Sequence, residues 1–226
     1  MKILALDTAT EACSVSLLVD DRAIDRYVEL ERGHGERLLP MIDEVLAEGG
    51  IALGALDAIA FGRGPGGFTG VRLAASVAQG LAFGAELGVV PVSDLAAVAQ
   101  HALKLAPYAD RILAVNDARM REVYFATFVA AAGGLVPEGP EHVGPAESVS
   151  LPEGAGWLAA GRGLAAYSEL DARCRQAGAR VFPQLFPRAI EVLELARPLV
   201  AAGQILDPAL ALPVYVRDNV AEAPTS

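Results

Sequence analysis

The 226-residue sequence has few cysteines and a shortage of positive charge. Its two cysteines, Cys13 and Cys174, lie far apart and neither belongs to a Cys-x-x-Cys pair, so neither a zinc site nor a disulfide framework is predicted. Eighteen basic against 28 acidic residues give a net charge of −10. This balance disfavours nucleic-acid binding by the chain alone, because phosphate neutralisation dominates such binding. If the chain serves an RNA, we expect a partner to carry the basic surface.

Long hydrophobic runs are also missing, although 53% of the residues are hydrophobic. Asp, Arg, Gln or Gly interrupts each apolar stretch before it reaches the length of a bilayer, and only a few apolar residues precede Asp7. The sequence therefore predicts an ordered globular protein without a membrane span or signal peptide. We expect it in the cytoplasm.

The most informative segment is the glycine-rich stretch at 62–72, which joins an apolar strand to a helix of small residues. It reads Gly-Arg-Gly-Pro-Gly-Gly-Phe-Thr-Gly-Val-Arg, which is neither a Walker A loop nor a dinucleotide fingerprint. Glycine permits close backbone approach, and free amides at a helix start favour an anion. A tight turn that serves only packing is the alternative. The candidate residues near a nucleotide or partner are Asp7, Gly64, Pro65, Gly66, Gly67, Thr69, Gly70 and Arg72.

The hydrophobic pattern predicts the order βββαβαβα, after which the pattern starts again. Strands are expected at 2–6, 12–19, 22–30, 57–61 and 89–92, with helices at 36–48, at about 69–86 and after Ser93. Later strands at 111–115 and 122–129 enclose a polar turn at Asp117 that echoes the turn after Asp7, as an internal duplication would. We expect an irregular stretch at 130–156, a strand at 157–160, helices at 164–176 and 188–202, and a frayed tail after Ala221.

This order resembles the architecture of actin, sugar kinases and the Hsp70 ATPase. Four motifs resemble the TsaB family of tRNA threonylcarbamoyladenosine biosynthesis proteins: Ile-Leu-Ala-Leu-Asp-Thr-Ala-Thr at 3–10, the glycine stretch, Asp-Ala-Arg at 117–119 with Glu-Val-Tyr at 122–124, and Pro-Val-Tyr-Val-Arg at 213–217. Gly67, Arg121 and Val216 replace the usual Ser, Gly and Leu, which affects fine loop contacts.

The resemblance runs end to end and implies an α/β fold of two actin-like, ribonuclease H-like lobes. Each lobe would be a mixed sheet flanked by helices, and the second would be degenerate. The N-terminal lobe is expected at 1–106, carrying the pairing helices. The C-terminal lobe is expected at 107–226, with its last segment packing back on the first.

The function implied by the resemblance is the transfer of a threonylcarbamoyl group to N6 of the adenosine next to the anticodon, in tRNAs that read codons beginning with A. In that family the chemistry belongs to a paralogue, TsaD, which works with the ATPase TsaE. This chain would be a noncatalytic subunit that dimerises with and activates TsaD, forms a homodimer when alone, and meets tRNA only through the complex. The complex would use ATP and magnesium, whereas the chain itself would bind no cofactor.

Two absences favour a noncatalytic role. The paralogue has two histidines four residues apart after its Pro-Val strand end, whereas here Ser93, Asp94 and Leu95 follow, so no metal site is expected. Glycines that could wrap a phosphate are missing after Asp7, which predicts weak or no nucleotide binding by the isolated chain. A turn cap is the alternative role for Asp7. The alternative functions are a self-sufficient ATP-dependent phosphotransferase, disfavoured by this turn, and a metallopeptidase, disfavoured by the missing histidines.

Two helices are expected to form a pairing surface. Glycine inside a helix costs about 1 kcal/mol relative to alanine, so small residues at intervals of four in the helix at 69–86 suggest a compensating close contact. Packing against the lobe's own sheet is the alternative. The helix at 36–48 carries a wide apolar face and is preceded by a histidine. The expected interface residues are His34, Leu38, Leu39, Ile42, Val45, Ser76, Gly80 and Gly84.

Overall fold

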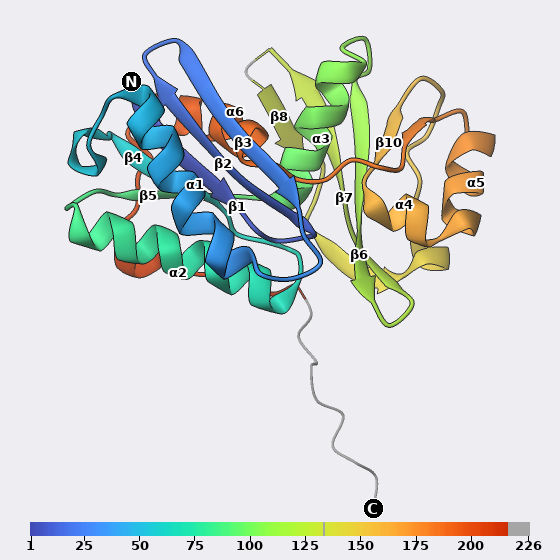
Figure 1. The fold of residues 1–226 in the computed structure, drawn as a ribbon. Coiled ribbons are helices and arrows are strands. Elements are labelled where there is room, and N and C mark those ends of the chain that lie inside the picture. Colours follow the sequence, from blue (N-terminus) through green and yellow to red (C-terminus); the bar gives the residue numbers. More distant parts are fainter. Residues whose placement is uncertain (133, 217–226) are drawn as a thin grey trace, which may run out of the picture.

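Two mixed β-sheets form the frame of the chain in a computed structural model that describes residues 1–132 and 134–216 (Figure 1). The first sheet has the order β3-β2-β1-β4-β5, in which β1, β2 and β3 are antiparallel and β4 and β5 run parallel to β1. Its strands are β1 (Lys2–Asp7), β2 (Ala12–Val19), β3 (Arg22–Glu29), β4 (Ala58–Gly62) and β5 (Val89–Val92).

The second sheet repeats this arrangement. Its order is β11-β10-β6-β7-β8, in which β6, β7 and β8 are antiparallel and β10 and β11 run parallel to β6. In addition, β9 pairs with β7. Its strands are β6 (Arg111–Arg119), β7 (Glu122–Ala131), β8 (Gly134–Pro137), β9 (His142–Pro145), β10 (Leu158–Ala160) and β11 (Arg180–Phe182). The chain therefore has the two-lobed, actin-like α/β fold, with shorter strands in the second lobe.

Helices cover both faces of each sheet because strand residues alternate between the faces. In β1, Leu4 and Leu6 pack against α1 (His34–Gly49) and α2 (Phe68–Gly84), whereas Ile3 and Ala5 face α6 (Ala189–Ala201). The second sheet packs one face on α3 (Asp94–Leu105) and the other on α4 (Arg162–Ala166) and α5 (Ser168–Gln176). Short 3₁₀ turns lie at η1 (Leu53–Ala55), η2 (Ala146–Ser148) and η3 (Pro208–Leu210).

The two lobes exchange a helix. Although α3 follows the last strand of the first sheet, it packs on β6, β7 and β10 of the second sheet. In return, α6 follows the last strand of the second sheet and packs on β1, β2 and β4 of the first. The helices α3 and α6 also contact each other between the sheets. No single cut in the chain therefore separates two packed units.

Several expected elements differ from those observed. The stretch at 130–156 is not irregular throughout, because it contains β8 and β9 as well as η2. The single helix expected at 164–176 is divided at Tyr167, whose φ of −125° and ψ of 86° are not helical. The strand β11 was not predicted. The expected frayed tail after Ala221 and the last residue of the motif at 213–217 lie outside the described residues.

Within the described residues, no helix has both the length and the apolar character needed to cross a bilayer.

Candidate functional site

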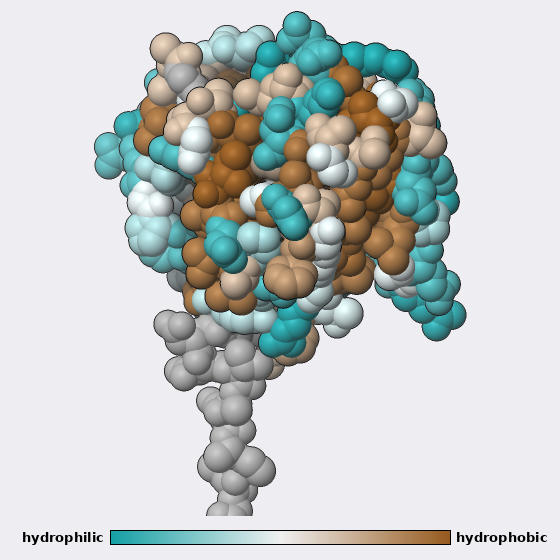
Figure 2. Space-filling model, turned by 90° about the vertical axis from the view of Figure 1, so that its left-hand side faces the viewer, coloured by the Kyte–Doolittle hydropathy of each residue, from teal (hydrophilic) through white to brown (hydrophobic). Residues whose placement is uncertain are grey.

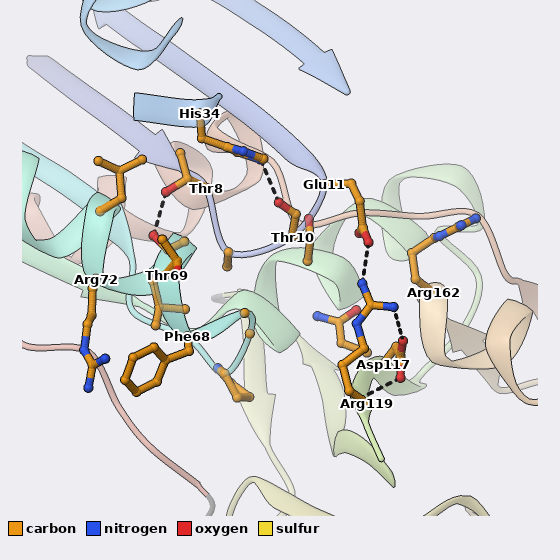
Figure 3. A pocket seen from close by; sticks show the side chains of 18 of the residues that line it. Thr8, Thr10, Glu11, His34, Phe68, Thr69, Arg72, Asp117, Arg119 and Arg162 are labelled. Atoms are coloured by element: carbon orange, nitrogen blue, oxygen red, sulfur yellow. Dashed lines mark hydrogen bonds and ion pairs between the residues drawn. The ribbon is translucent and has the colours of Figure 1, made fainter. Parts of the chain in front are cut away.

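A cleft of about 1470 Å³ opens between the two lobes (Figure 3). The first lobe contributes the turn between β1 and β2, the start of α1 and the glycine loop. The second lobe contributes the turn between β6 and β7 and the start of α4. Six of the eight residues predicted to lie near a nucleotide or partner line it, together with His34 of the predicted pairing surface: Pro65, Gly66, Gly67, Thr69, Gly70 and Arg72.

The glycine loop packs tightly on the first turn. The Gly67 amide donates to the Ala9 carbonyl at 2.7 Å, and the Thr8 hydroxyl donates to the Gly70 carbonyl at 2.7 Å. A Cβ at Gly70 would collide with the Thr8 carbonyl oxygen, and a Cβ at Gly66 would lie 2.6 Å from the Ala9 carbonyl oxygen. Glycine is therefore required at both positions for close packing. The sequence left open whether these glycines serve such packing or contact with an anion.

Asp7 does not line the cleft. Its side chain is fully buried, and one carboxylate oxygen accepts the Ala9 amide at 3.0 Å, which makes Asp7 a cap of its own turn. Its other oxygen faces the carboxyl group of Asp94, the first residue of α3. Burial raises the pKa of Asp7 above its usual range. Gly64, the other predicted residue outside the cleft lining, donates its amide to Asp94.

An ion pair spans the cleft mouth between the two hairpin turns. The Arg119 guanidinium lies 3.0 Å from the Glu11 carboxylate of the first lobe and 3.2 Å from the Asp117 carboxylate of its own turn (Figure 3). The side chains of Arg119 and Glu11 are 76% and 44% exposed, so the pair contributes at most about 1 kcal/mol to stability. It joins the hairpin turns of the two lobes directly.

Sequence reasoning missed Glu11, Arg119 and Arg162 as residues of the cleft. Arg119 belongs to the recognised Asp-Ala-Arg motif, which was the available signal. Its partner Glu11 is 108 positions away in the chain, and only the folded structure brings the two together.

Arg72 lies at the junction of α2 and the C-terminal segment. Its guanidinium carbon is 3.2 Å from the centre of the Phe68 ring and 5.2 Å from that of Tyr215, and its Nε donates to the Tyr215 hydroxyl at 2.7 Å. Cation–π contacts of this kind contribute about 0.5–1 kcal/mol at exposed sites. The structure therefore places the glycine stretch at 62–72 in contact with the motif at 213–217, although the two are far apart in the sequence.

The exposed surfaces of α1 and α2 only partly match the predicted pairing surface. Leu38, Ile42 and Val45 are at most 2% exposed and pack in the core of the first lobe, so they cannot form a surface, and their expected role is corrected. The helical period placed these residues on one face correctly, but that face packs against the lobe's own sheet. Leu39, by contrast, is 49% exposed.

The small-residue stripe of α2 faces outward. Ser76, Gly80 and Gly84 are exposed, and no described atom outside the local helix lies within 4 Å of a Cβ built at either glycine. The adjacent Phe83 is 80% exposed. The stripe therefore does not serve packing on the lobe's own sheet. Apolar patches lie between polar ones on the side of the molecule turned to the viewer in Figure 2.

His34 begins α1 and points toward the first turn (Figure 3). Its Nε2 lies 2.9 Å from the Thr10 carbonyl oxygen, so this ring ties the start of α1 to the cleft lining. Among the described residues, no group of three or more His, Cys, Asp or Glu side chains is arranged to hold a metal ion.

Comparisons with known proteins cover nearly the whole chain. A family model described as TsaD, tRNA N6-adenosine threonylcarbamoyltransferase, matches residues 28–224. The tRNA threonylcarbamoyladenosine biosynthesis protein TsaB of Haemophilus influenzae is 39% identical over 97% of this chain and 95% of its own length. That of Escherichia coli is 40% identical over 98% and 96%. The solved structure of YeaZ from Pseudomonas aeruginosa is similar with a TM-score of 0.85 and 44% identity, covering 95% of this chain and 99% of its own.

Proposed function

Because this chain belongs to the TsaB family of tRNA threonylcarbamoyladenosine biosynthesis proteins, within the broader TsaD family, we propose that it is a noncatalytic partner subunit in that modification. Participation in the biosynthesis of the modified adenosine follows from the family. The proposal adds that the chain dimerises with the catalytic paralogue TsaD and activates it, together with the ATPase TsaE.

The outward stripe on α2 is the observation that carries this proposal. Gly80 lies inside α2, where glycine reduces helix stability by about 1 kcal/mol relative to alanine, and no described contact within this chain offsets that cost; Gly84 is the last residue of the helix. Small residues let a second helix approach closely, the adjacent Phe83 adds exposed apolar area on α2, and Leu39 adds some on α1. The stripe therefore fits a helix of a partner, either TsaD or, in its absence, a second copy of this chain.

The state of the cleft supports a role without catalysis by this chain. Asp7 is buried against Asp94, so it is not available to a magnesium-bound phosphate in the cleft. At the hairpin turns the Arg119 guanidinium is already engaged by the carboxylates of Glu11 and Asp117, so it is not free to bind a phosphate there. A self-sufficient ATP-dependent phosphotransferase is accordingly not favoured. We propose that ATP and magnesium are used by the complex, and that the complex supplies the contact with tRNA.

The test combines a pairing measurement with a reconstituted reaction. Gly80→Leu fills the stripe with a good helix former, which favours the folded helix by about 1 kcal/mol while blocking close approach. We expect the variant to keep or slightly raise its melting temperature, lose pairing in light scattering, and fail to support threonylcarbamoyl transfer to tRNA by TsaD and TsaE. Omission of the chain should have the same effect on transfer.

The matched control is Gly139→Leu, at an exposed glycine of the second lobe where a Cβ likewise meets no described atom within 4 Å. It should pair and support transfer like the unmodified chain. Unchanged mass and transfer with Gly80→Leu would refute the pairing surface. Full transfer without the chain would refute the function.

A further inference from the structure

Two buried carboxyl groups meet at the point where β1, the glycine loop and α3 come together. Asp7 and Asp94 are both 0% exposed. Their facing oxygens, Oδ2 of Asp7 and Oδ1 of Asp94, have no other hydrogen-bond partner among the described residues. A Cβ at Gly62 would collide with both oxygens, which shows that the two groups converge over this glycine.

The remaining carboxylate oxygens are already occupied. Oδ1 of Asp7 accepts the Ala9 amide at 3.0 Å, and Oδ2 of Asp94 accepts the Gly64 amide. Two ionised carboxylates in contact and out of water repel each other strongly, and each would lack a donor for its facing oxygen. A single proton between the two oxygens removes one charge and satisfies both.

We propose that Asp7 and Asp94 share one proton, and that this proton locks the glycine loop and the start of α3 onto the first turn. Burial is the main cause that raises the pKa of both groups, and the neighbouring Asp7 charge further raises that of Asp94. The inference concerns the joint between the lobes and does not depend on the proposed pairing.

Two of the segments joined by this proton, the first turn and the glycine loop, line the cleft. The Asp94 amide donates to the Gly64 carbonyl at 3.0 Å, so Asp94 holds the glycine loop from both its backbone and its side chain. Asp7 in turn holds Ala9, whose carbonyl accepts the Gly67 amide. Loss of the proton leaves two facing negative charges between these segments, and the loop is expected to loosen from the turn.

The surrounding charged groups do not neutralise the pair. His34 on α1 favours the ionised form of Asp7, whereas Glu191 on α6 disfavours it. Arg63 favours the ionised form of Asp94, but its guanidinium is engaged by both oxygens of Glu141 at 3.0 and 3.2 Å. The Cys13 thiol on β2 stays neutral, since burial, followed by the Asp7 charge, raises its pKa to about 11.

The direction of the pH effect follows from the raised pKa of the pair. The folded state binds the shared proton more tightly than the unfolded chain does, so the lock is complete below the ordinary aspartate pKa. It weakens as the pH rises through the raised pKa in the folded state. Opening of the glycine loop should therefore increase with pH.

Asp94→Asn tests this lock without removing its shape. The amide still accepts from Gly64 and donates permanently to Asp7, but it cannot ionise. In the unmodified chain, hydrogen exchange of the peptide covering the glycine loop, corrected for the intrinsic effect of pH, should rise severalfold from acid to mildly alkaline pH. In Asp94→Asn this rise should disappear. The control Asp43→Asn changes an exposed carboxyl of α1 and should behave like the unmodified chain.

Infrared spectroscopy provides an independent readout. The unmodified chain at neutral pH should show the carbonyl stretch of a buried protonated carboxylic acid, and this band should be lost in both Asp7→Asn and Asp94→Asn. Absence of the band in the unmodified chain would overturn the shared proton. An equal pH-dependent rise in loop exchange in the unmodified chain and in Asp94→Asn would overturn the lock.

Discussion

Three successive residues at the tip of the β6–β7 hairpin have left-handed backbone conformations. Arg119, Met120 and Arg121 have φ angles of 61°, 54° and 64°, in a region that glycine adopts without steric cost. For other residues this conformation costs roughly 1–2 kcal/mol. The turn holds Arg119 where it bridges to Glu11, so the strain lies beside the cleft.

At the scale of one residue, Arg121→Gly should raise the free energy of unfolding. Relief of the left-handed strain is partly offset by the larger entropy of glycine in the unfolded chain, so we expect a net gain of up to about 1 kcal/mol. The measurement is denaturant unfolding. Arg32→Gly removes the same side chain at an exposed position without positive φ, and there the free energy of unfolding should fall by about 0.4–1 kcal/mol. A loss of stability in Arg121→Gly would contradict the strain argument.

Single residues also show the limit of what the sequence could predict. The glycine spacing at 62–72 correctly indicated close backbone approach, because glycine is required wherever a Cβ would collide. The same reasoning placed Asp7 in a candidate site, but it could not identify Asp94 as its partner. Asp7 ends β1 and Asp94 follows β5, and the parallel order β1-β4-β5 brings the carboxyl ends of these strands to one edge of the sheet.

At the scale of elements, the exchanged helices α3 and α6 are joined by a buried charge. The Glu191 side chain on α6 is 0% exposed and lies 2.8 Å from the Arg188 guanidinium and 3.2 Å from the Lys104 ammonium on α3. These two cations are 27% and 39% exposed. The charge therefore fixes how the helix of one lobe meets the helix of the other.

Glu191→Gln should destabilise the chain, because it removes the carboxylate that pairs with Arg188 and leaves Lys104 with Glu194 alone. Removing one partner of a buried pair costs about 3–5 kcal/mol, and partial exposure of the cations reduces this to an expected loss of about 2 kcal/mol in urea unfolding. Glu194→Gln changes a more exposed partner of the same lysine and should cost less than about 1 kcal/mol. Equal losses of unfolding free energy in the two variants would show that the burial of Glu191 does not increase its contribution to stability.

Element prediction succeeded where a periodic pattern was long. The helices at 34–49 and 68–84 and the first three strands were predicted to within a few residues. Each of these helices buries one face, whereas β1 and β2 are continuous apolar runs buried on both faces. The strands β8, β9 and β11 have three or four residues, too few to show a period. The buried face of α1 was assigned to a partner, because periodicity identifies an apolar face without identifying what covers it.

At the scale of the whole molecule, the two lobes share a strand order and a turn but differ in how far the aspartate of that turn is buried. Both sheets have the same strand order, and in both an aspartate near the end of the central strand caps the amide two residues later, as Asp7 does for Ala9 and Asp117 for Arg119 at 2.9 Å. The echo between these turns in the sequence is therefore confirmed as a repeated structure. Their environments differ, since Asp7 is buried and Asp117 is 20% exposed.

The charge of the whole molecule leads to the last prediction, which concerns tRNA. A chain with a net charge of −10 gains little from releasing the counterions of a phosphate backbone, and this release supplies most of non-specific affinity. We expect the chain alone to bind labelled tRNA with a dissociation constant above about 10 μM at physiological salt, measured by fluorescence anisotropy.

The dependence on salt separates the contribution of each subunit. If the partner supplies the basic surface, the slope of the logarithm of affinity against the logarithm of salt concentration should be the same for TsaD alone and for TsaD with this chain. The absolute affinity can still change, because pairing can alter the conformation of TsaD without adding phosphate contacts. A steeper slope in the presence of this chain would mean that its own arginines reach the tRNA. Mutation of Arg119 and Arg162, the cleft arginines near the second-lobe turn, should then reduce that slope.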